Sequence, residues 1–154
     1  MNNSTSEQGL FVVVVGAIIE DQKTGRVLLL KRSNNVMREP GIWEDPAGRM
    51  QQHEEPEAAL HREVKEECGL DIEVVKPLNT FHAYYEYEEP VGKTEVVGII
   101  YWCRATSNEV HLSDEHSDYR WLSPNEALEI VEHPGVREDI KAYLREKGSM
   151  AQLS

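Results

Sequence analysis

Three glutamates near the end of one predicted helix have the types and spacing that would support chemistry. Glu63, Glu66 and Glu67 precede Gly69, where the helix is expected to end. At about 100° per residue, their side chains fall on one arc of roughly 100° and project together. Like charges four residues apart destabilise a helix by about 0.2–0.5 kcal/mol per pair, and carboxylates in the last turn oppose the helix dipole. Stability alone would favour Lys or Arg in that turn.

Two interpretations of this cluster are open when it is considered by itself. It is either a solvated acidic face on an acidic protein, or a place where a hard cation binds between the carboxylates and reverses their repulsion. Magnesium prefers oxygen ligands and is held in proteins by a few carboxylates together with substrate phosphates. The residues around the cluster decide between the two.

The spacing around the helix follows a longer pattern. Its defined positions are Gly48, Glu54, Arg62, Glu63, Val64, Glu66, Glu67, Gly69 and Leu70. They resemble the Nudix box, G-x5-E-x7-R-E-U-x-E-E-x-G-U with U apolar, at every defined position. Chance agreement is on the order of one in a million, compared with ordinary residue usage. The opening hairpin, the lead-in over 43–48 and the segment 119–122 are also similar to this family.

The resemblance implies roles for the glutamates. Glu63, Glu66 and Glu67 would bind divalent metal, Mg²⁺ with Mn²⁺ as a substitute, and Glu63 would alternatively orient or deprotonate the attacking water. Ala47 is the one departure, because the family usually has a glycine there. The family uses the backbone carbonyl at that position as a metal ligand, which an alanine also supplies.

The other residues of the box are expected to be structural. Arg62 lies one turn before two of the carboxylates and Glu54 lies on the approaching loop, which suggests a salt bridge that fixes the loop against the helix. Gly48 and Gly69 permit the backbone to bend where a side chain would obstruct it.

Residues outside the box complete the expected site. The family often recruits one further acidic residue from a later loop, and Glu115 is the candidate, with Asp118 in reserve. The alternative is that Glu115 only belongs to an acidic turn before a strand. Arg32 and Arg49 flank the expected site and either grip phosphate as planar forks or form surface salt bridges.

A row of aromatic residues bears on the substrate. Alternation places Phe81, Ala83, Tyr85 and Tyr87 on one strand face, where rings either stack on a nucleobase or pack in the core. Tyr85 and Tyr87 are the substrate-binding candidates. In the family, a proline at the first of these two places implies ADP-ribose and a tyrosine at the second implies dinucleoside polyphosphates. ADP-ribose is therefore disfavoured, whereas nucleoside triphosphates and nucleotide sugars stay open.

The elements that must position these residues follow from hydrophobic periodicity and from turn and capping residues. The box helix begins at Glu54 or Glu55, has Pro56 in its first turn and ends at Gly69, with a left-handed cap. The other expected elements are strands over 11–19, 26–31, 72–75, 80–87, 94–105 and 119–122, a turn over 88–93, a helix from Ser123-Pro124 to about residue 131 and a final helix over 136–146.

These elements predict a single domain over residues 10–147, with flexible tails over 1–9 and 148–154. The family resemblance implies the α/β (α+β) Nudix fold, a mixed β-sheet sandwiched between helices. The formal net charge of -12 argues against binding to a nucleic acid duplex or an anionic membrane. Two cysteines make no disulfide framework, which favours a cytoplasmic protein.

The resemblance implies an enzyme that hydrolyses a phosphorus–oxygen bond in a nucleoside diphosphate linked to another moiety. One alternative is a Nudix-fold module that senses a nucleotide without cutting it, although such modules usually have an eroded box. A second is an acidic interaction domain without metal. A third is an isomerase on the same fold, which would need a catalytic cysteine. A homodimer is a further option, since the family often dimerises.

Overall fold

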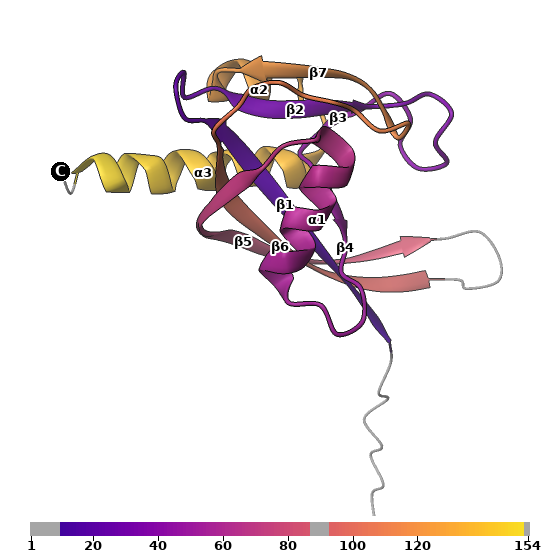
Figure 1. Ribbon diagram of the computed structural model, residues 1–154. Helices are drawn as coiled ribbons and strands as arrows, with labels where there is room; N and C mark the ends of the chain where they lie inside the picture. The colour runs from indigo at the N-terminus through magenta and orange to yellow at the C-terminus, as the bar shows by residue number, and fades with distance from the viewer. Residues whose placement is uncertain (1–9, 87–92, 153–154) are drawn as a thin grey trace, which may run out of the picture.

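A seven-stranded mixed sheet forms the centre of the molecule (Figure 1). The computed structural model describes residues 10–86 and 93–152. The sheet has the order β3-β2-β1-β6-β5, with β4 paired to β1 and β7 paired to β2. The strands are β1 (Phe11–Asp21), β2 (Val27–Arg32), β3 (Trp43–Glu44), β4 (Ala47–Arg49), β5 (Ile72–Glu86), β6 (Lys93–Ala105) and β7 (His116–Leu122).

Strand β1 is the middle of this sheet, and its Val- and Ile-rich sequence explains why. It runs parallel to β6 along its whole length and antiparallel to β4 at Val14–Gly16. Its side chains enter two separate cores, because successive residues of a strand point to opposite faces. Ala17 lies in one buried cluster and Ile18 in the other. The prediction of a buried opening strand is confirmed.

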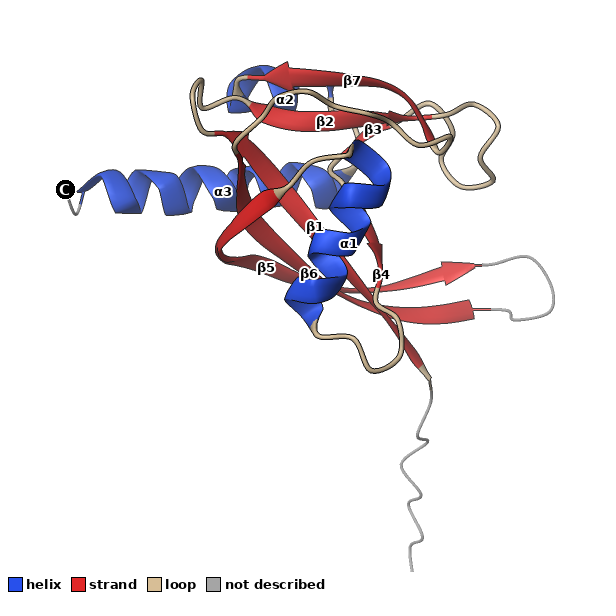
Figure 2. Cartoon of the chain, in the orientation of Figure 1, coloured by secondary structure: helices blue, strands red, loops and turns tan. Residues whose placement is uncertain are grey.

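Helices cover both faces of the sheet (Figure 2). They are α1 (Pro56–Cys68), α2 (Pro124–Ile130) and α3 (Pro134–Gln152). Leu60 and Val64 of α1 pack in the cluster that contains Ala17, whereas Ile140 and Tyr143 of α3 pack in the cluster that contains Ile18. The expected mixed sheet between helices is therefore confirmed.

The third and fourth predicted strands, over 72–75 and 80–87, are one strand in the structure. Strand β5 continues through the gap left between 75 and 80, and its pairing with β6 shifts register around Lys76 and around Pro77. Pro77 is tolerated because β5 is at the edge of the sheet, where a missing N–H breaks no ladder on the open side. The prediction of two separate strands was therefore wrong.

Two elements near the C-terminus are longer than expected. Strand β7 begins at His116 rather than Tyr119, because its first residues pair with β2. Helix α3 begins at Pro134 and continues through Gly148 to Gln152, well past the expected end at residue 146. A helical glycine destabilises by about 1 kcal/mol relative to alanine, which does not end a long helix that is anchored elsewhere.

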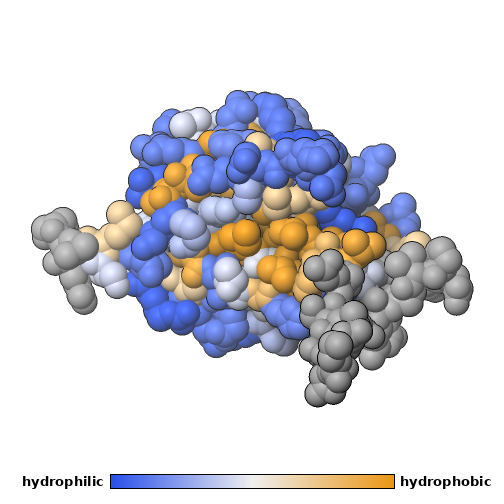
Figure 3. All heavy atoms as spheres, turned by 90° about the horizontal axis from the view of Figure 1, so that it is seen from below, coloured by the Kyte–Doolittle hydropathy of each residue, from blue (hydrophilic) through white to orange (hydrophobic). Residues whose placement is uncertain are grey.

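The surface seen from below Figure 1 carries a band of hydrophobic residues between hydrophilic margins (Figure 3). Leu10 and Phe11, at the start of β1, are among the exposed large apolar side chains. None of the described helices has the length and apolar character needed to cross a membrane. Tyr87 and most of the predicted turn over 88–93 lie outside the described residues.

Candidate active site

Helix α1 holds the box glutamates at a fixed orientation. Pro56 occupies its first turn, and Gly69 ends it with a φ of 70° and an N–H that donates to the Lys65 carbonyl. Leu60 and Val64 are buried against the sheet. The capping residues fix the length of the helix and the apolar stripe fixes its rotation, so the adjoining arc of carboxylates faces one edge of the core.

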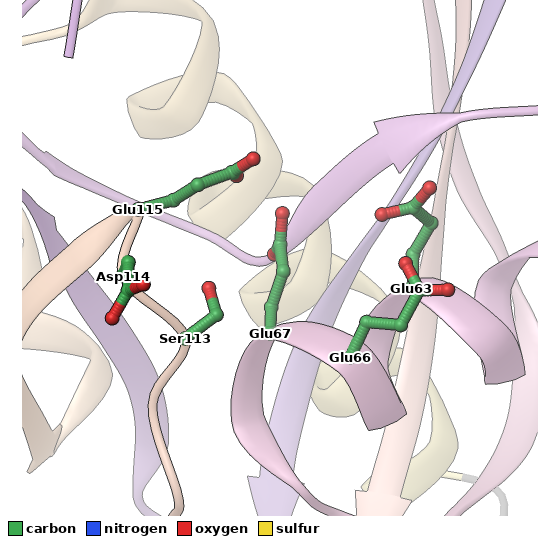
Figure 4. A pocket seen from close by; sticks show the side chains of 6 residues that line it. All are labelled: Glu63, Glu66, Glu67, Ser113, Asp114 and Glu115. Atoms are coloured by element: carbon green, nitrogen blue, oxygen red, sulfur yellow. The ribbon is translucent and has the colours of Figure 1, made fainter.

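A cleft of about 320 Å³ opens beside this arc (Figure 4). It lies between α1 and the loop that precedes β7, and it is lined by Glu63, Glu66, Glu67, Ser113, Asp114 and Glu115. In Figure 4, Glu115 extends from the loop toward Glu67. The structure thus brings the expected loop carboxylate to the three box glutamates, whereas the reserve residue Asp118 is not part of the lining.

Backbone hydrogen bonds hold the loop against α1. The Ser113 N–H donates to the Glu67 carbonyl over 3.2 Å, and the Ser33 N–H donates to the Glu115 carbonyl over 2.8 Å. The Ser33 hydroxyl also donates to the Asp114 carbonyl. The loop is therefore tied at one side to the helix and at the other to the end of β2, which fixes Glu115 opposite α1.

Glu67 is the most deeply buried of these carboxylates, with 6% of its surface exposed. Burial, together with the charges of Glu44, Glu63 and Glu115, raises its pKa well above the usual value. Its Oε2 accepts a hydrogen bond of 3.2 Å from the Ala47 N–H, a neutral donor. A cation placed beside Glu67 would relieve this repulsion.

Glu63 and Glu66 differ from Glu67 because Arg62 contacts both. Its Nη1 lies 2.8 Å from a Glu63 oxygen and 3.3 Å from a Glu66 oxygen. Burial raises the pKa of Glu63 despite the arginine, and the charges of Glu66 and Glu115 act in the same direction. Glu63 also lies directly against Gly48, where a Cβ would stand 2.0 Å from its Oε2.

The salt bridge expected between Glu54 and Arg62 is present and bidentate. Nε donates over 2.7 Å and Nη2 over 2.8 Å to the two oxygens of Glu54. Nη2 also donates to the Arg49 carbonyl over 3.0 Å. The hydrogen bonds from Arg62 and from the Gln51 N–H lower the pKa of Glu54 to about 2. Arg62 therefore joins the loop, β4 and the helix at one point.

Glu44 and His116 adjoin this site, and sequence reasoning gave Glu44 no role. The Glu44 Oε1 accepts hydrogen bonds from Arg32 Nη1, at 3.1 Å, and from His116 Nε2, at 2.9 Å. The Arg32 Nε donates to the Arg38 carbonyl. The Arg32 guanidinium thus forms hydrogen bonds with neighbouring protein groups. Its role as a phosphate ligand stays a prediction.

The remaining substrate-binding candidates lie outside the lining of the cleft. Arg49 is exposed at the end of β4. Tyr85 is half-buried on β5, and the Arg38 guanidinium stands 4.0 Å above its ring. Phe81, four residues earlier on the same face of β5, packs in the part of the core that contains α3. In the expected aromatic row, Phe81 therefore packs in the core, whereas one face of the Tyr85 ring is covered by Arg38.

Both cysteines are core residues. Cys68 and Cys103 are free and buried. Burial raises the pKa of each thiol, and that of Cys103 reaches about 12, with a contribution from the charge of Glu57. Thiols of this kind are inert as nucleophiles, because the thiolate is the reactive form. The isomerase alternative, which needs a catalytic cysteine, has no support in this fold.

The donors in the cleft suit a hard divalent cation. The three glutamates of the arc offer carboxylate oxygens, as do Asp114 and Glu115 of the loop. Mg²⁺ prefers such oxygens over nitrogen or sulfur. Within residues 10–86 and 93–152, no three acidic, histidine or cysteine side chains already converge on one ion position. This arrangement is compatible with Mg²⁺, which keeps several waters and uses one or two carboxylates together with substrate phosphates.

Comparisons with known proteins agree with this geometry. The family model described as NUDIX domain matches residues 10–145. The chain is 33% identical over 125 residues to the asymmetrical bis(5'-nucleosyl)-tetraphosphatase of Sus scrofa, covering 77% of this chain and 76% of that protein. It is 31% identical over 110 residues to the nucleoside triphosphatase NudI of Salmonella agona (strain SL483), covering 68% of this chain and 78% of that protein.

A solved structure adds the same likeness in three dimensions. The MutT protein from Methanosarcina mazei Go1 superposes with a TM-score of 0.73 at 28% identity, and the match covers 92% of this chain and 99% of that chain. The complete box around α1, the mixed sheet between helices and the family match over 10–145 lead to one conclusion: this chain belongs to the Nudix hydrolases.

Proposed function

We propose that this protein hydrolyses a phosphorus–oxygen bond in a nucleoside diphosphate linked to another moiety, by attack of water on phosphorus with Mg²⁺ bound. Mn²⁺ is the expected substitute. The observation that carries the proposal is the buried Glu67, which faces Glu63 and Glu115 in an all-oxygen cleft. Such an arrangement is unfavourable in the protein alone and becomes favourable with a cation between the carboxylates.

Each residue then has a defined task. Glu63, Glu66 and Glu67 hold the cation, with the Ala47 carbonyl and Glu115 as further oxygen donors. When bound, the ion lowers the pKa of a coordinated water and neutralises charge on the phosphoryl oxygens. Glu63 is also placed to orient or deprotonate the attacking water in the alternative arrangement, since Arg62 and Gly48 fix its side chain.

Substrate recognition is assigned to residues around the cleft. Arg32 and Arg49 are proposed to contact phosphate, and Tyr85 to stack on a base, together with Tyr87 beyond the described residues. The relatives support a nucleotide substrate, because one is a tetraphosphatase of bis(5'-nucleosyl) compounds and another a nucleoside triphosphatase. Nucleoside triphosphates, dinucleoside polyphosphates and nucleotide sugars are therefore the substrates to compare.

A substrate panel tests the proposal. Compounds of these three classes are incubated with and without Mg²⁺, and the products are identified by mass. Turnover is expected only with the divalent ion. Glu66→Gln and Glu67→Gln should each reduce kcat by orders of magnitude, because each removes a charge that holds the ion. Glu138→Gln, on the exposed face of α3, is the control and should retain full activity.

Other outcomes identify the alternatives. Tight nucleotide binding without product at any metal concentration would indicate a sensing module instead of an enzyme. Full turnover in both glutamine variants would show that the site is elsewhere.

The free, buried thiols fit the proposed cytoplasmic location. The absence of nucleic acid binding and the homodimer stay predictions, to be checked by gel shift and sedimentation equilibrium.

A further inference from the structure

Glu44 lies beside the box glutamates although it belongs neither to the box nor to the lining of the cleft. It ends β3, and the chain reaches Ala47, whose N–H donates to Glu67, within three residues. Among the charges that act on Glu67, that of Glu44 ranks ahead of those of Glu63 and Glu115. The hydrogen bond between Glu44 and His116, the residue directly after Glu115, places this further carboxylate next to the loop that lines the cleft.

The orientation of Glu44 is fixed by two donors. An ionised carboxylate has no proton to donate and acts only as an acceptor. Arg32 Nη1 and His116 Nε2 therefore both donate to its Oε1. The two donors come from adjacent strands, since Arg32 of β2 pairs with His116 of β7. Both bonds are to the same oxygen, which leaves Oε2 outside this pair of contacts.

His116 is an unfavourable residue for stability alone. Its side chain is 0% exposed. Its Nδ1 is among the buried atoms that have no hydrogen-bond partner within the described residues. Leaving a buried polar atom unsatisfied costs about 1–3 kcal/mol, which an apolar side chain would avoid. The imidazole is retained at a position where its one hydrogen bond orients Glu44.

We propose that Glu44 supplies a further carboxylate oxygen to the hydrated divalent cation at this site, and that His116 is the positioning residue that holds Glu44. This inference rests on the proposed function. Groups that orient metal-binding side chains typically change metal affinity or activity by about 10–100-fold when they are removed. The competing explanation is a structural network in which Arg32, His116 and Glu44 only tie β2, β3 and β7 together.

Binding of Mn²⁺ alone distinguishes the two explanations without reference to activity. Calorimetric titration of the full chain with Mn²⁺, in the absence of nucleotide, gives the Kd of each variant. Glu44→Gln keeps the size and hydrogen-bonding capacity of the side chain but removes its charge, and it should weaken Mn²⁺ binding about 10–100-fold. Glu95→Gln is the matched control, because Glu95 accepts a similar bond of 2.7 Å from His82 on β5, and its Kd should equal that of the wild type.

Two His116 variants test the positioning role. His116→Leu removes the donor together with the unsatisfied nitrogen, so Mn²⁺ affinity should fall about tenfold while the melting temperature is maintained or raised. His116→Gln keeps an N–H donor and should restore much of the affinity. A purely structural network predicts instead that His116→Leu lowers the melting temperature and leaves the Kd for Mn²⁺ unchanged.

The outcomes separate this inference from the proposed function. If the wild type binds Mn²⁺ and turns over substrate while folded Glu44→Gln binds Mn²⁺ equally tightly, only this inference is overturned. If the wild type does not bind Mn²⁺, the proposed function fails and this inference fails with it. Should Glu44→Gln not fold, the affinity of His116→Leu decides, and an unchanged Kd overturns the inference.

Discussion

At the scale of single residues, Gly48 is a position where a small substitution is expected to have a large effect on turnover. A Cβ there would stand 2.0 Å from Oε2 and 2.6 Å from Cγ of Glu63, so the whole side chain of Glu63 must move. Displacement of a reacting group by about 1 Å reduces turnover by about 10²-fold. We expect Gly48→Ala to reduce kcat by at least that factor while the protein still folds, as steady-state kinetics and circular dichroism will show.

Gly148 provides the control for this substitution. It lies in α3, where an added Cβ meets nothing within 4 Å. Gly148→Ala should stabilise the protein by up to about 1 kcal/mol through helix propensity and leave kcat unchanged. Normal turnover in Gly48→Ala would mean that the position of Glu63 does not matter for catalysis.

At the scale of elements, the bidentate pair of Glu54 and Arg62 joins the box loop to α1. The pKa of Glu54 is lowered from 4.5 to about 2, so the folded protein holds this carboxylate ionised more strongly than the unfolded chain does. The stability from this pair is fully present above pH 4.5 and is lost as the pH falls toward 2. Glu54→Gln should therefore be less stable than the wild type at pH 7, with a difference that narrows in acid.

Urea unfolding of both proteins between pH 7 and pH 2.5 measures that difference. The expected curves converge as the pH falls, because protonated Glu54 no longer attracts the guanidinium. A difference in the free energy of unfolding that stays constant across this range would show that the charge of Glu54 contributes nothing to the link between loop and helix.

The bounds of the helices and strands also show what the sequence alone can predict. The limits of α1 were predicted nearly to the residue, because Pro56 and Gly69 act on their own neighbours in the chain. The continuity of β5 was missed, since pairing with β6 rather than local propensity holds Pro77 in the strand. Glu44 was missed for a similar reason. Its contacts with Arg32 and His116 exist only once β2, β3 and β7 are in register.

At the scale of the whole molecule, α3 is joined to the sheet through buried acidic residues. Asp139 of α3 and Asp45, just after β3, interact electrostatically, and Asn79 of β5 donates to Asp139 over 3.2 Å. Burial raises the pKa of both carboxyl groups. The folded state therefore holds a proton more tightly than the unfolded chain, and the free energy of unfolding falls as the pH rises above the ordinary value of 3.8.

Asp139→Asn tests this buried pair. An amide can accept from Asn79 and donate to Asp45 without an extra proton, so the variant should be more stable than the wild type by about 1 kcal/mol or more at pH 8, and by less at pH 5. Glu138→Gln, which alters an exposed pair with Lys141 on the same helix, should change stability by less than about 0.5 kcal/mol at either pH. Destabilisation of Asp139→Asn at pH 8 would contradict the account.

The central claim is that a divalent cation sits among carboxylates that would otherwise repel one another. The most direct measurement is the anomalous difference density of a crystal of the wild-type protein soaked in Mn²⁺. We predict a peak inside the cleft, within coordination distance of oxygens from Glu63, Glu66 or Glu67. Saturating Mn²⁺ with no anomalous peak beside these side chains, in a crystal that leaves the cleft open to solvent, would contradict it.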